Sequence, residues 1–401
     1  MPEPAAGRVL SGMRPTGHLH LGHHLCVLSQ WQQLQRANEC FFFVADWHAL
    51  TTGGAADAPG QLTGQSLAMV TAWLAAGIDP DRSVIYVQSA LREPAELALL
   101  LAMICPLPWA ERVPTFRDYC TSKSRDEISV GFLGYPILQA ADILMHSADH
   151  VPVGEDQLPH IEFARELARR FNELFGKDAG WQEQSDACAA KLSDQAAFDD
   201  CCRRYQQGGD EQARHQAIEM IAQAQLGGEQ KQRLAGRIEG SGREILKPPA
   251  PLVAPVAKMP GLDGRKMSKS YGNDIGMLEP RSSFEPRLLK MPTDPARVRR
   301  TDPGDPKKCP VWPLHEIFSD AKTCSWVEDG CKSAAIGCRD CKAALADHVE
   351  RHSAPLIERS EPWLAQPQRV AQIIEQGNAR AKDSAAKTMT EVRQAVGLCS
   401  L

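Results

Sequence analysis

The stretch Ser11-Gly-Met-Arg-Pro-Thr-Gly-His-Leu-His-Leu-Gly-His-His24 decides how this chain folds. The run Gly7-Arg-Val-Leu10 before it favours a short strand. After it, apolar residues recur at helical spacing, at Leu25, Leu28, Trp31 and Leu34. We therefore expect a strand, a tight turn and a helix. The helix would begin around His20-Leu-Gly-His23, where free backbone N–H groups and the helix dipole favour a phosphate.

The two imidazoles of this stretch lie three residues apart, so they share one helical face. Both can donate to phosphate oxygens, and Gly22 lets a flat ligand approach the backbone. A histidine-rich, half-buried first helix would give the same pattern, so this stretch alone leaves both interpretations open.

The amino-acid composition limits the class of protein, the partners and the location that we can expect. A chain of 401 residues, 43% hydrophobic and 24% charged, is typical of a globular protein with two or three domains. The net charge of −5 means that any nucleic acid must be bound by local basic patches, and no DNA partner is expected. The stretch Met1-Pro-Glu-Pro-Ala-Ala6 lacks the basic flank and apolar core of a signal peptide, and no apolar run approaches the roughly 20 residues that span a membrane, so we expect neither segment. The 13 cysteines, an odd number, predict a reducing cytoplasmic location without a disulfide framework.

A parallel sheet is predicted from the next segments. Cys40-Phe-Phe-Phe-Val-Ala45 is a continuous apolar run of the kind buried on both faces, and Val84-Ile-Tyr-Val87 favours a further strand. Strands alternating with helical stretches predict an α/β fold with a doubly wound sheet. Ligands lie beyond the carboxyl ends of such strands, which makes Asp46 and His48 site candidates. A helix cap and a packed ring would be the alternative.

Polar residues also mark a later helix and turn. In Gly131-Phe-Leu-Gly-Tyr-Pro-Ile-Leu-Gln-Ala-Ala-Asp-Ile-Leu144, which we expect to be helical after Pro136, three polar side chains fall on one face, at Tyr135, Gln139 and Asp142. They suggest a pocket wall. Val151-Pro-Val-Gly-Glu-Asp-Gln157 then predicts a turn with two carboxylates.

The second half contains an insertion and a cationic loop. Residues 176–247 are rich in Gln, Glu and Arg, and we expect a weakly packed helical insertion there. Lys258-Met-Pro-Gly-Leu-Asp-Gly-Arg-Lys-Met-Ser-Lys-Ser270 follows. Its Lys266, Ser268 and Lys269 are spaced to contact several phosphate oxygens, although taken alone they could form an ordinary surface loop.

Taken together, His20-Leu-Gly-His23 and Lys266-Met-Ser-Lys-Ser270 resemble the paired signature of class I aminoacyl-tRNA synthetases. The stretches 11–17, 135–144 and 151–157 resemble those of bacterial tryptophanyl-tRNA synthetases, and the resemblance covers residues 8–175 and 252–401. It implies a Rossmann-like doubly wound parallel sheet with a helical insertion and a C-terminal α-helical anticodon-binding domain. The expected ranges are 1–175 and 251–274 for the catalytic domain, 176–250 for the insertion and 275–401 for the last domain.

The resemblance also implies the nucleotide site. ATP with Mg²⁺ would lie over the first helix, and the catalytic residues would be His20, His23, Lys266 and Lys269. The other implied ATP-binding residues are Arg14, Pro15, Thr16, Gly22, Gly154, Glu155, Asp156, Lys258, Met259, Met267, Ser268 and Ser270.

For tryptophan, the resemblance implies that Asp142 accepts the indole N–H. The remaining pocket residues would be Leu10, His48, Tyr135, Gln139, Val151, Val153 and Gln157. Leu10 and Gln139 depart from the best-known pattern, which has Phe and Met there. Gln139 could bind the substrate ammonium, as in the tyrosyl enzymes, so a tyrosine–tRNA ligase remains an alternative. A non-catalytic RNA-binding paralogue is another.

The implied partners are L-tryptophan, tRNA(Trp) and a second copy of the chain in a homodimer. A metal site is expected at Cys309, Cys331, Cys338 and Cys341, because their spacing suits four thiolate ligands. The resemblance to a subset of the family suggests a [4Fe–4S] cluster, with Zn²⁺ as the alternative. Cys324 remains a substitute for Cys309, and unligated thiols are the simplest alternative.

Overall fold

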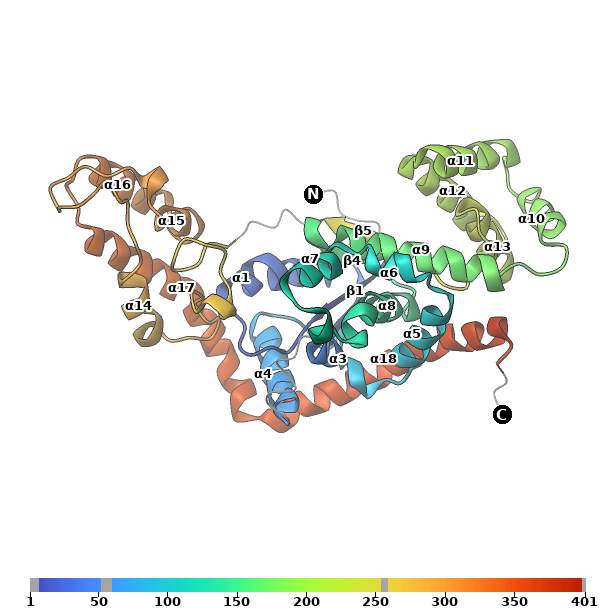
Figure 1. Ribbon diagram of the computed structural model, residues 1–401, viewed down its shortest axis with the longest axis horizontal. Coiled ribbons are helices and arrows are strands. Elements are labelled where there is room, and N and C mark those ends of the chain that lie inside the picture. The colour runs from blue at the N-terminus through green and yellow to red at the C-terminus, as the bar shows by residue number, and fades with distance from the viewer. Residues whose placement is uncertain (1–6, 52–59, 254–258, 399–401) are drawn as a thin grey trace.

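The structure, a computed structural model, describes residues 7–51, 60–253 and 259–398. Figure 1 shows a central sheet covered by helices, a group of helices α14–α17 to one side and a second group α10–α13 to the other. Among the described helices, none combines the length and apolar character needed to cross a bilayer. The described cysteines are all free of disulfides.

The sheet contains five parallel strands in the order β3-β2-β1-β4-β5. The bounds are Arg8–Met13 for β1, Glu39–Val44 for β2, Ser83–Val87 for β3, His150–Val153 for β4 and Ala250–Val253 for β5. The chain runs outward from β1 to β3 and then resumes on the other side of β1. This reversal confirms the predicted doubly wound sheet and places a topological switch point between β1 and β4.

Side chains of β2 alternate between two cores. Phe41 and Phe43 pack with the helices α5 (Glu93–Ile104), α8 (Val130–Met145) and α9 (Leu158–Phe175). Phe42 and Val44 pack on the opposite face with α2 (Ser29–Leu34) and α4 (Gln61–Ala75). Trp31 of α2 stacks on Phe42 with ring centroids 4.2 Å apart. The continuous apolar run of this strand is therefore explained by burial on both faces.

The quoted N-terminal stretch forms the expected strand, turn and helix. After β1 the chain enters α1 (Leu21–His23), a π-helical turn (His24–Leu28) and then α2. Three short helices follow later in the same domain: α3 (Asp46–Leu50), α6 (Leu107–Glu111) and α7 (Pro114–Ser122). Single π-helical turns such as His24–Leu28 are frequent at functional sites.

Helix α8 begins earlier than expected. It starts at Val130 because the Ser129 hydroxyl accepts a hydrogen bond from the Phe132 N–H and caps it, so Pro136 lies inside the helix and not at its start. The earlier start does not change which residues share a helical face, and Asp142 lies nearly two turns beyond Pro136 in the same helix.

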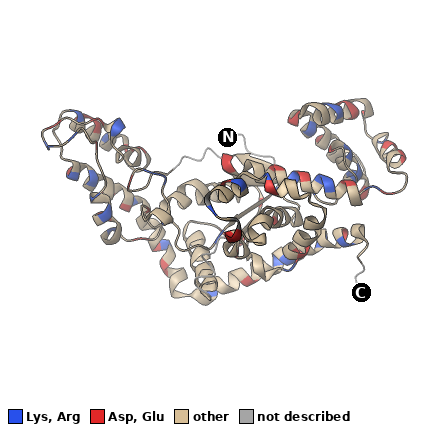
Figure 2. Ribbon diagram, viewed as in Figure 1, with Lys and Arg blue, Asp and Glu red and all other residues tan. Residues whose placement is uncertain are grey.

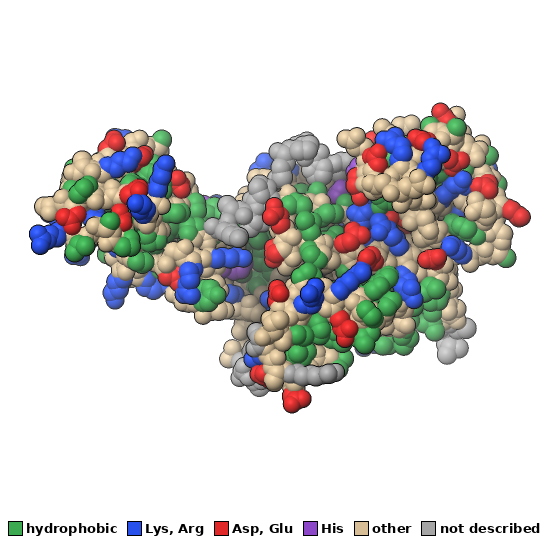
Figure 3. All heavy atoms as spheres, turned by 45° about the horizontal axis from the view of Figure 1, so that its top comes forward, with side chains coloured by type: hydrophobic (Ala, Val, Ile, Leu, Met, Phe, Trp, Pro, Cys, Tyr) green, Lys and Arg blue, Asp and Glu red, His purple; other side chains and the backbone are tan. Residues whose placement is uncertain are grey.

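The insertion is a packed unit, so the expectation of weak packing is wrong. Its helices are α10 (Trp181–Ala189), α11 (Gln195–Gly208), α12 (Glu211–Gln223) and α13 (Gly228–Ile238). They enclose a core of twelve buried residues, half of which are alanine or cysteine and half large, among them Phe198, Leu234 and Ile238. Small residues allow close helix approach, and a count of large aliphatic side chains overlooks such a core. Figure 3 shows charges of both signs on its surface.

Ionic and amide contacts attach the insertion to α9. The buried carboxylate of Glu239 accepts from Arg169 Nε of α9 at 2.8 Å and from Arg214 Nε of α12 at 2.7 Å. At the end of α9, buried Asn172 accepts from the N–H groups of Ile245 and Leu246, at 3.0 and 2.9 Å. Figure 2 shows both signs of charge along α9 and the insertion.

The C-terminal helices divide between two places. Helices α14 (Arg281–Leu289), α15 (Trp312–Phe318), α16 (Ala321–Lys332) and α17 (Cys338–Ala365) make up most of the outlying group. The last helix, α18 (Pro367–Val396), returns beneath the sheet domain and packs beside β3 (Figure 1). Its Ala381, Ala385 and Met389 belong to the sheet core, so the expected 275–401 range is not one separate unit.

Candidate active site

The two predicted signature stretches lie side by side, although almost 250 residues separate them. Leu21 N donates to Ile275 O at 2.9 Å, and His20 and Gly276 form a β-bridge. His18 Nε2 lies 2.5 Å from Asp274 Oδ2, so the segment after the cationic loop is attached to the turn before α1. The loop thereby lies over the start of the first helix.

His20 and His23 share one face of this helix, as expected. Their ring centroids are 3.8 Å apart, and His20 N donates to His23 Nδ1 at 3.2 Å. Burial is the main cause that lowers the pKa of His20 to about 4 and that of His23 to about 3. Both rings are therefore neutral at pH 7, and a neutral ring can donate one hydrogen bond without carrying charge. His20 Nδ1 is buried and lies against Gly22, 2.9 Å from where a Cβ atom of that residue would be.

Gly22 lies between His20 and the loop. A Cβ atom there would be 2.9 Å from the His20 ring and 3.1 Å from Met259 Cβ, so only glycine fits without a shift. Met259 and Met267 are buried in a core that also contains Leu21, and Met267 N donates to Met259 O at 2.8 Å. The predicted Lys258 lies outside the described residues.

Lys269 already contacts the turn before α1. Its Nζ donates to Thr16 O at 2.6 Å and lies 3.3 Å from Thr16 Oγ1. The loop is supported by buried Asn273, which accepts from Ser268 N at 2.8 Å and donates to Asp263 Oδ1 at 2.6 Å. The charge of Lys266 contributes to the lowered pKa of His20, so both predicted lysines lie near the histidines.

The second predicted turn follows β4 at the carboxyl edge of the sheet. Gly154 precedes a 3₁₀ turn over Glu155–Gln157 in which both carboxylates are exposed. Gln157 Nε2 donates to Asp156 Oδ2 at 3.0 Å. Gln157 is half-buried, and its contact with the substrate stays a prediction.

The predicted tryptophan pocket is centred on Asp142, which is completely buried. His48 Nε2 of α3 donates to Asp142 Oδ2 at 2.9 Å. The ring of His48 lies 6.5 Å from that of Tyr135, whose hydroxyl is 2.6 Å from His160 Nε2. Leu10 and Val151 belong to the same buried core, with Val153 packed against it, and Gln139 is half-buried on the same helix as Asp142.

Sequence reasoning missed Gln88, which donates from Nε2 to both oxygens of Asp142, at 2.9 and 2.8 Å. It also missed the bonds of Asp46, which accepts from Ser89 N at 3.0 Å and from the Ser89 hydroxyl. A usable signal was present, because Gln88 and Ser89 directly follow the predicted strand 84–87, where ligands of an open α/β sheet lie.

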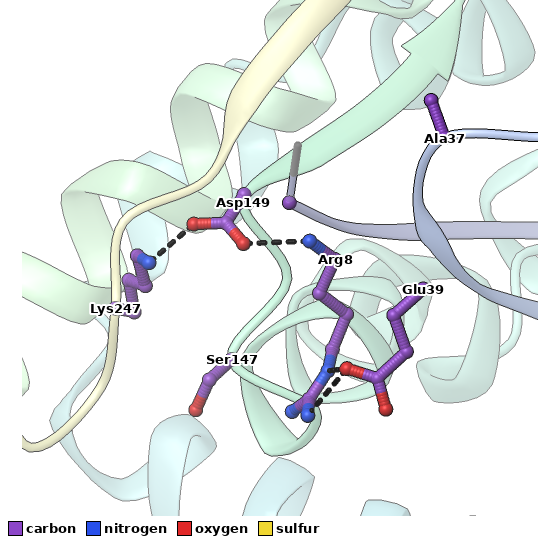
Figure 4. A pocket seen from close by; sticks show the side chains of 7 residues that line it. Arg8, Ala37, Glu39, Ser147, Asp149 and Lys247 are labelled. Atoms are coloured by element: carbon purple, nitrogen blue, oxygen red, sulfur yellow. Dashed lines mark hydrogen bonds and ion pairs between the residues drawn. The ribbon is translucent and has the colours of Figure 1, made fainter. Parts of the chain in front are cut away.

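An open cavity of about 500 Å³ lies at the other end of the sheet (Figure 4). Its charges pair with each other: Arg8 with Glu39 at 2.8 Å, and Lys247 with Asp149. Arg8 and Glu39 begin β1 and β2, so the cavity lies at the amino ends of these strands, away from Asp142. Strand position and the grouping of polar residues both favour the carboxyl ends as the candidate active site.

The cysteine prediction has weaker support. Burial, and then the neighbouring Cys309, Cys331 and Cys338, raise the pKa of Cys341 to about 12, so the four thiols share one region. Their present partners are of other kinds: Cys341 Sγ lies 3.3 Å from His315 Nε2, and Cys324 donates to backbone carbonyls. Within residues 7–51, 60–253 and 259–398, no three His, Cys, Asp or Glu side chains are grouped to hold a metal ion. The described side chains thus form no metal site as they now lie, and the expected cluster is unsupported.

Comparison with known proteins agrees with this geometry. The family described as tRNA synthetases class I (W and Y) matches residues 4–189 and 203–353. The tryptophan–tRNA ligase of Ralstonia nicotianae is 49% identical, and that of Thermotoga maritima 41%, with 98% or more of each relative and 98% of this chain covered. The structure resembles Campylobacter jejuni tryptophanyl-tRNA synthetase complexed with ADP and tryptophan, with a TM-score of 0.73, 25% identity and coverage of 98% and 100%. The chain therefore belongs to the tryptophanyl-tRNA synthetases, within the class I synthetases for tryptophan and tyrosine.

Proposed function

We propose that the protein activates L-tryptophan with MgATP to tryptophanyl-adenylate and pyrophosphate, and then transfers tryptophan to tRNA(Trp). The observation that carries this proposal is the completely buried Asp142 carboxylate at the carboxyl edge of a sheet domain in which the two signature stretches are connected. An indole N–H supplies the hydrogen-bond donor that such a carboxylate requires, and phenylalanine does not.

The residues support activation by positioning and charge. The tryptophan carboxylate attacks the α-phosphorus of ATP, the bond to the β-phosphate breaks, and pyrophosphate leaves. Neutral His20 and His23 donate N–H groups to phosphate oxygens, while the ammonium groups of Lys266 and Lys269 balance the developing charge. The ribose hydroxyl of the tRNA end then attacks the adenylate carbonyl and AMP leaves, with no covalent enzyme intermediate.

The test is amino-acid-dependent ATP–pyrophosphate exchange across all twenty amino acids, followed by charging of tRNA(Trp). We expect tryptophan alone to stimulate exchange strongly. Stimulation by tyrosine and not tryptophan would favour the tyrosyl alternative, in which Gln139 binds the substrate ammonium. The absence of exchange with every amino acid would favour a non-catalytic RNA-binding role.

We also propose a homodimer joined through the sheet domains. Four apolar side chains from α5, α6 and the start of α8 are more than half exposed: Leu99, Met103, Leu107 and Val130. A second copy of the chain would cover this surface with a self-complementary interface.

Sedimentation should give a dimer for the wild type and a monomer for the double variant Leu99→Lys, Met103→Glu. Leu174→Lys, at an exposed position on α9, is the control. A wild-type monomer that charges tRNA fully at micromolar concentration would refute the dimer.

For the cysteines, we propose a metal site with a [4Fe–4S] cluster first and Zn²⁺ second. The shared region of Cys309, Cys331, Cys338 and Cys341 supports it, although their sulfurs would have to converge on one point. Anaerobically purified protein should contain about four irons per chain and be brown. Stoichiometric zinc would identify the alternative, and metal-free protein would refute both.

A further inference from the structure

Gln88 is completely buried at the end of β3, in direct contact with the predicted specificity carboxylate. Its Nε2 donates to Asp142 Oδ1 at 2.9 Å and to Oδ2 at 2.8 Å. Its Oε1 accepts from Trp47 N at 3.1 Å. A flipped amide would set Oε1 against the carboxylate and its NH₂ group against the Trp47 N–H, so only one orientation is favourable.

The backbone on either side of Gln88 is also held. Val87 N donates to Asn378 Oδ1 of α18 at 3.0 Å, and Ser89 N donates to Asp46 Oδ1 at 3.0 Å. Gly377 lets α18 lie against β3, because a Cβ there would be 1.7 Å from Ile85 O. The amide of Gln88 is therefore attached to a strand end that cannot shift easily.

A count of acceptor sites shows what this arrangement leaves open. A carboxylate offers about four lone-pair directions. Oδ2 of Asp142 is occupied by Gln88 and His48, whereas Oδ1 accepts only from Gln88 among the hydrogen bonds of the described residues. One direction on Oδ1 remains for an incoming donor.

We propose that Gln88 is a positioning residue for amino-acid selection, which holds Asp142 by both oxygens and leaves one acceptor site of Oδ1 for the indole N–H. This inference rests on the proposed tryptophan specificity. It assigns a role beyond that of Asp142, because removing Gln88 would leave the carboxylate in place but free to rotate towards His48.

Gln88 also affects the ionisation of Asp142. Burial raises the pKa of Asp142 and the charge of Asp46 acts in the same direction, while the hydrogen bonds from His48 and Gln88 oppose them. From β3, Tyr86 lies within electrostatic reach of Asp142, and from α9, His160 lies within reach of His48. Without the amide of Gln88, Asp142 would take up a proton at higher pH and lose the charge that strengthens its bond to indole.

The test uses Gln88→Met, which keeps the volume and removes the amide. The KM for tryptophan in ATP–pyrophosphate exchange should rise about tenfold or more, as expected for the loss of order around one charge-assisted hydrogen bond. The KM for ATP and kcat should change less than threefold. The tryptophan KM should rise further as the pH falls from 8.5 to 6.

Gln88→Glu gives the opposite pH dependence and is nearly isosteric. At low pH the two carboxyl groups share one proton, so the introduced carboxyl group can donate to Asp142 as the amide does. At high pH both ionise and repel, and the tryptophan KM should rise. Gln35→Met is the matched control, because Gln35 is also buried and donates to Gly77 O at 2.9 Å, far from the pocket. It should leave both KM values unchanged.

The outcomes separate the two proposals. A wild type without tryptophan-dependent exchange would overturn the proposed function. An active wild type, with folded Gln88 variants whose tryptophan KM and pH profile match it, would overturn only the role of Gln88.

Discussion

Asp142→Ala should damage the selection of tryptophan far more than the use of ATP. In the wild type, a completely buried carboxylate with two protein donors offers one acceptor site to the substrate. A hydrogen bond to a charged group in such a place contributes about 1.5–3 kcal/mol, which corresponds to roughly 10- to 150-fold in affinity. We therefore expect the tryptophan KM to rise by about 10²-fold and the ATP KM to change little.

The discrimination between tryptophan and phenylalanine should also fall in Asp142→Ala. The wild-type site rejects phenylalanine because one acceptor site of the buried carboxylate would stay unpaired, and sites of this kind discriminate by about 10⁴-fold. Alanine removes that penalty, so the ratio of kcat/KM for tryptophan over phenylalanine should fall by at least tenfold. Exchange assays with tryptophan, tyrosine and phenylalanine measure both effects, and circular dichroism checks folding. A folded variant with an unchanged tryptophan KM would refute the assignment of Asp142.

Three further predictions concern other parts of the molecule. Lys269→Ala should slow amino-acid activation by about 10²-fold or more in single-turnover assays, with tryptophan binding nearly unchanged, because a transition-state charge contact is lost; near wild-type rates would contradict the loop assignment. Burial lowers the pKa of His146 to about 3, so it stays neutral in the fold while its unfolded form is protonated below about pH 6.5. Its contribution to the free energy of unfolding should therefore fall by about 2 kcal/mol from pH 7 to pH 5, and urea titrations of His146→Phe should lack that part of the slope. Gly377→Ala should destabilise the protein by about 1–3 kcal/mol through overpacking against Ile85, whereas Gly64→Ala, at an exposed helical site with open space, should stabilise it by up to about 1 kcal/mol. Equal effects of the two alanines would contradict the close packing of α18.

The parts of the fold that sequence could predict have local causes. The run Cys40–Ala45 predicts a strand buried on both faces because each of its side chains is apolar, and β2 places them alternately in two cores. We predicted that the two signature stretches act together because they resemble a known family, and hydrophobic periodicity played no part in that prediction. Only the structure showed the bonds between Leu21 and Ile275 that bring them together.

The features that the sequence could not predict depend on which distant elements of the chain pack against each other. Helix α18 has an apolar face, but nothing in its pattern says that β3 lies opposite. An amide such as Gln88 belongs to no motif, and its role depends on Trp47 and Asp142, which lie 41 and 54 residues away. The core of the insertion escaped notice because half of its buried residues are alanine or cysteine, packed with Phe198 and other large side chains.

The return of α18 to the sheet has a consequence for how the chain folds during synthesis. Its residues fill the core beside β3, and Asn378 and Arg380 bond to the exposed backbone of that strand and the turn before it. Helix α18 follows every strand of the sheet in the sequence, so β3 is synthesised long before its edge is covered. An unpaired strand edge favours association between chains. A product that ends before Pro367 should therefore accumulate as aggregate, because the edge of β3 that α18 covers would stay open to another chain.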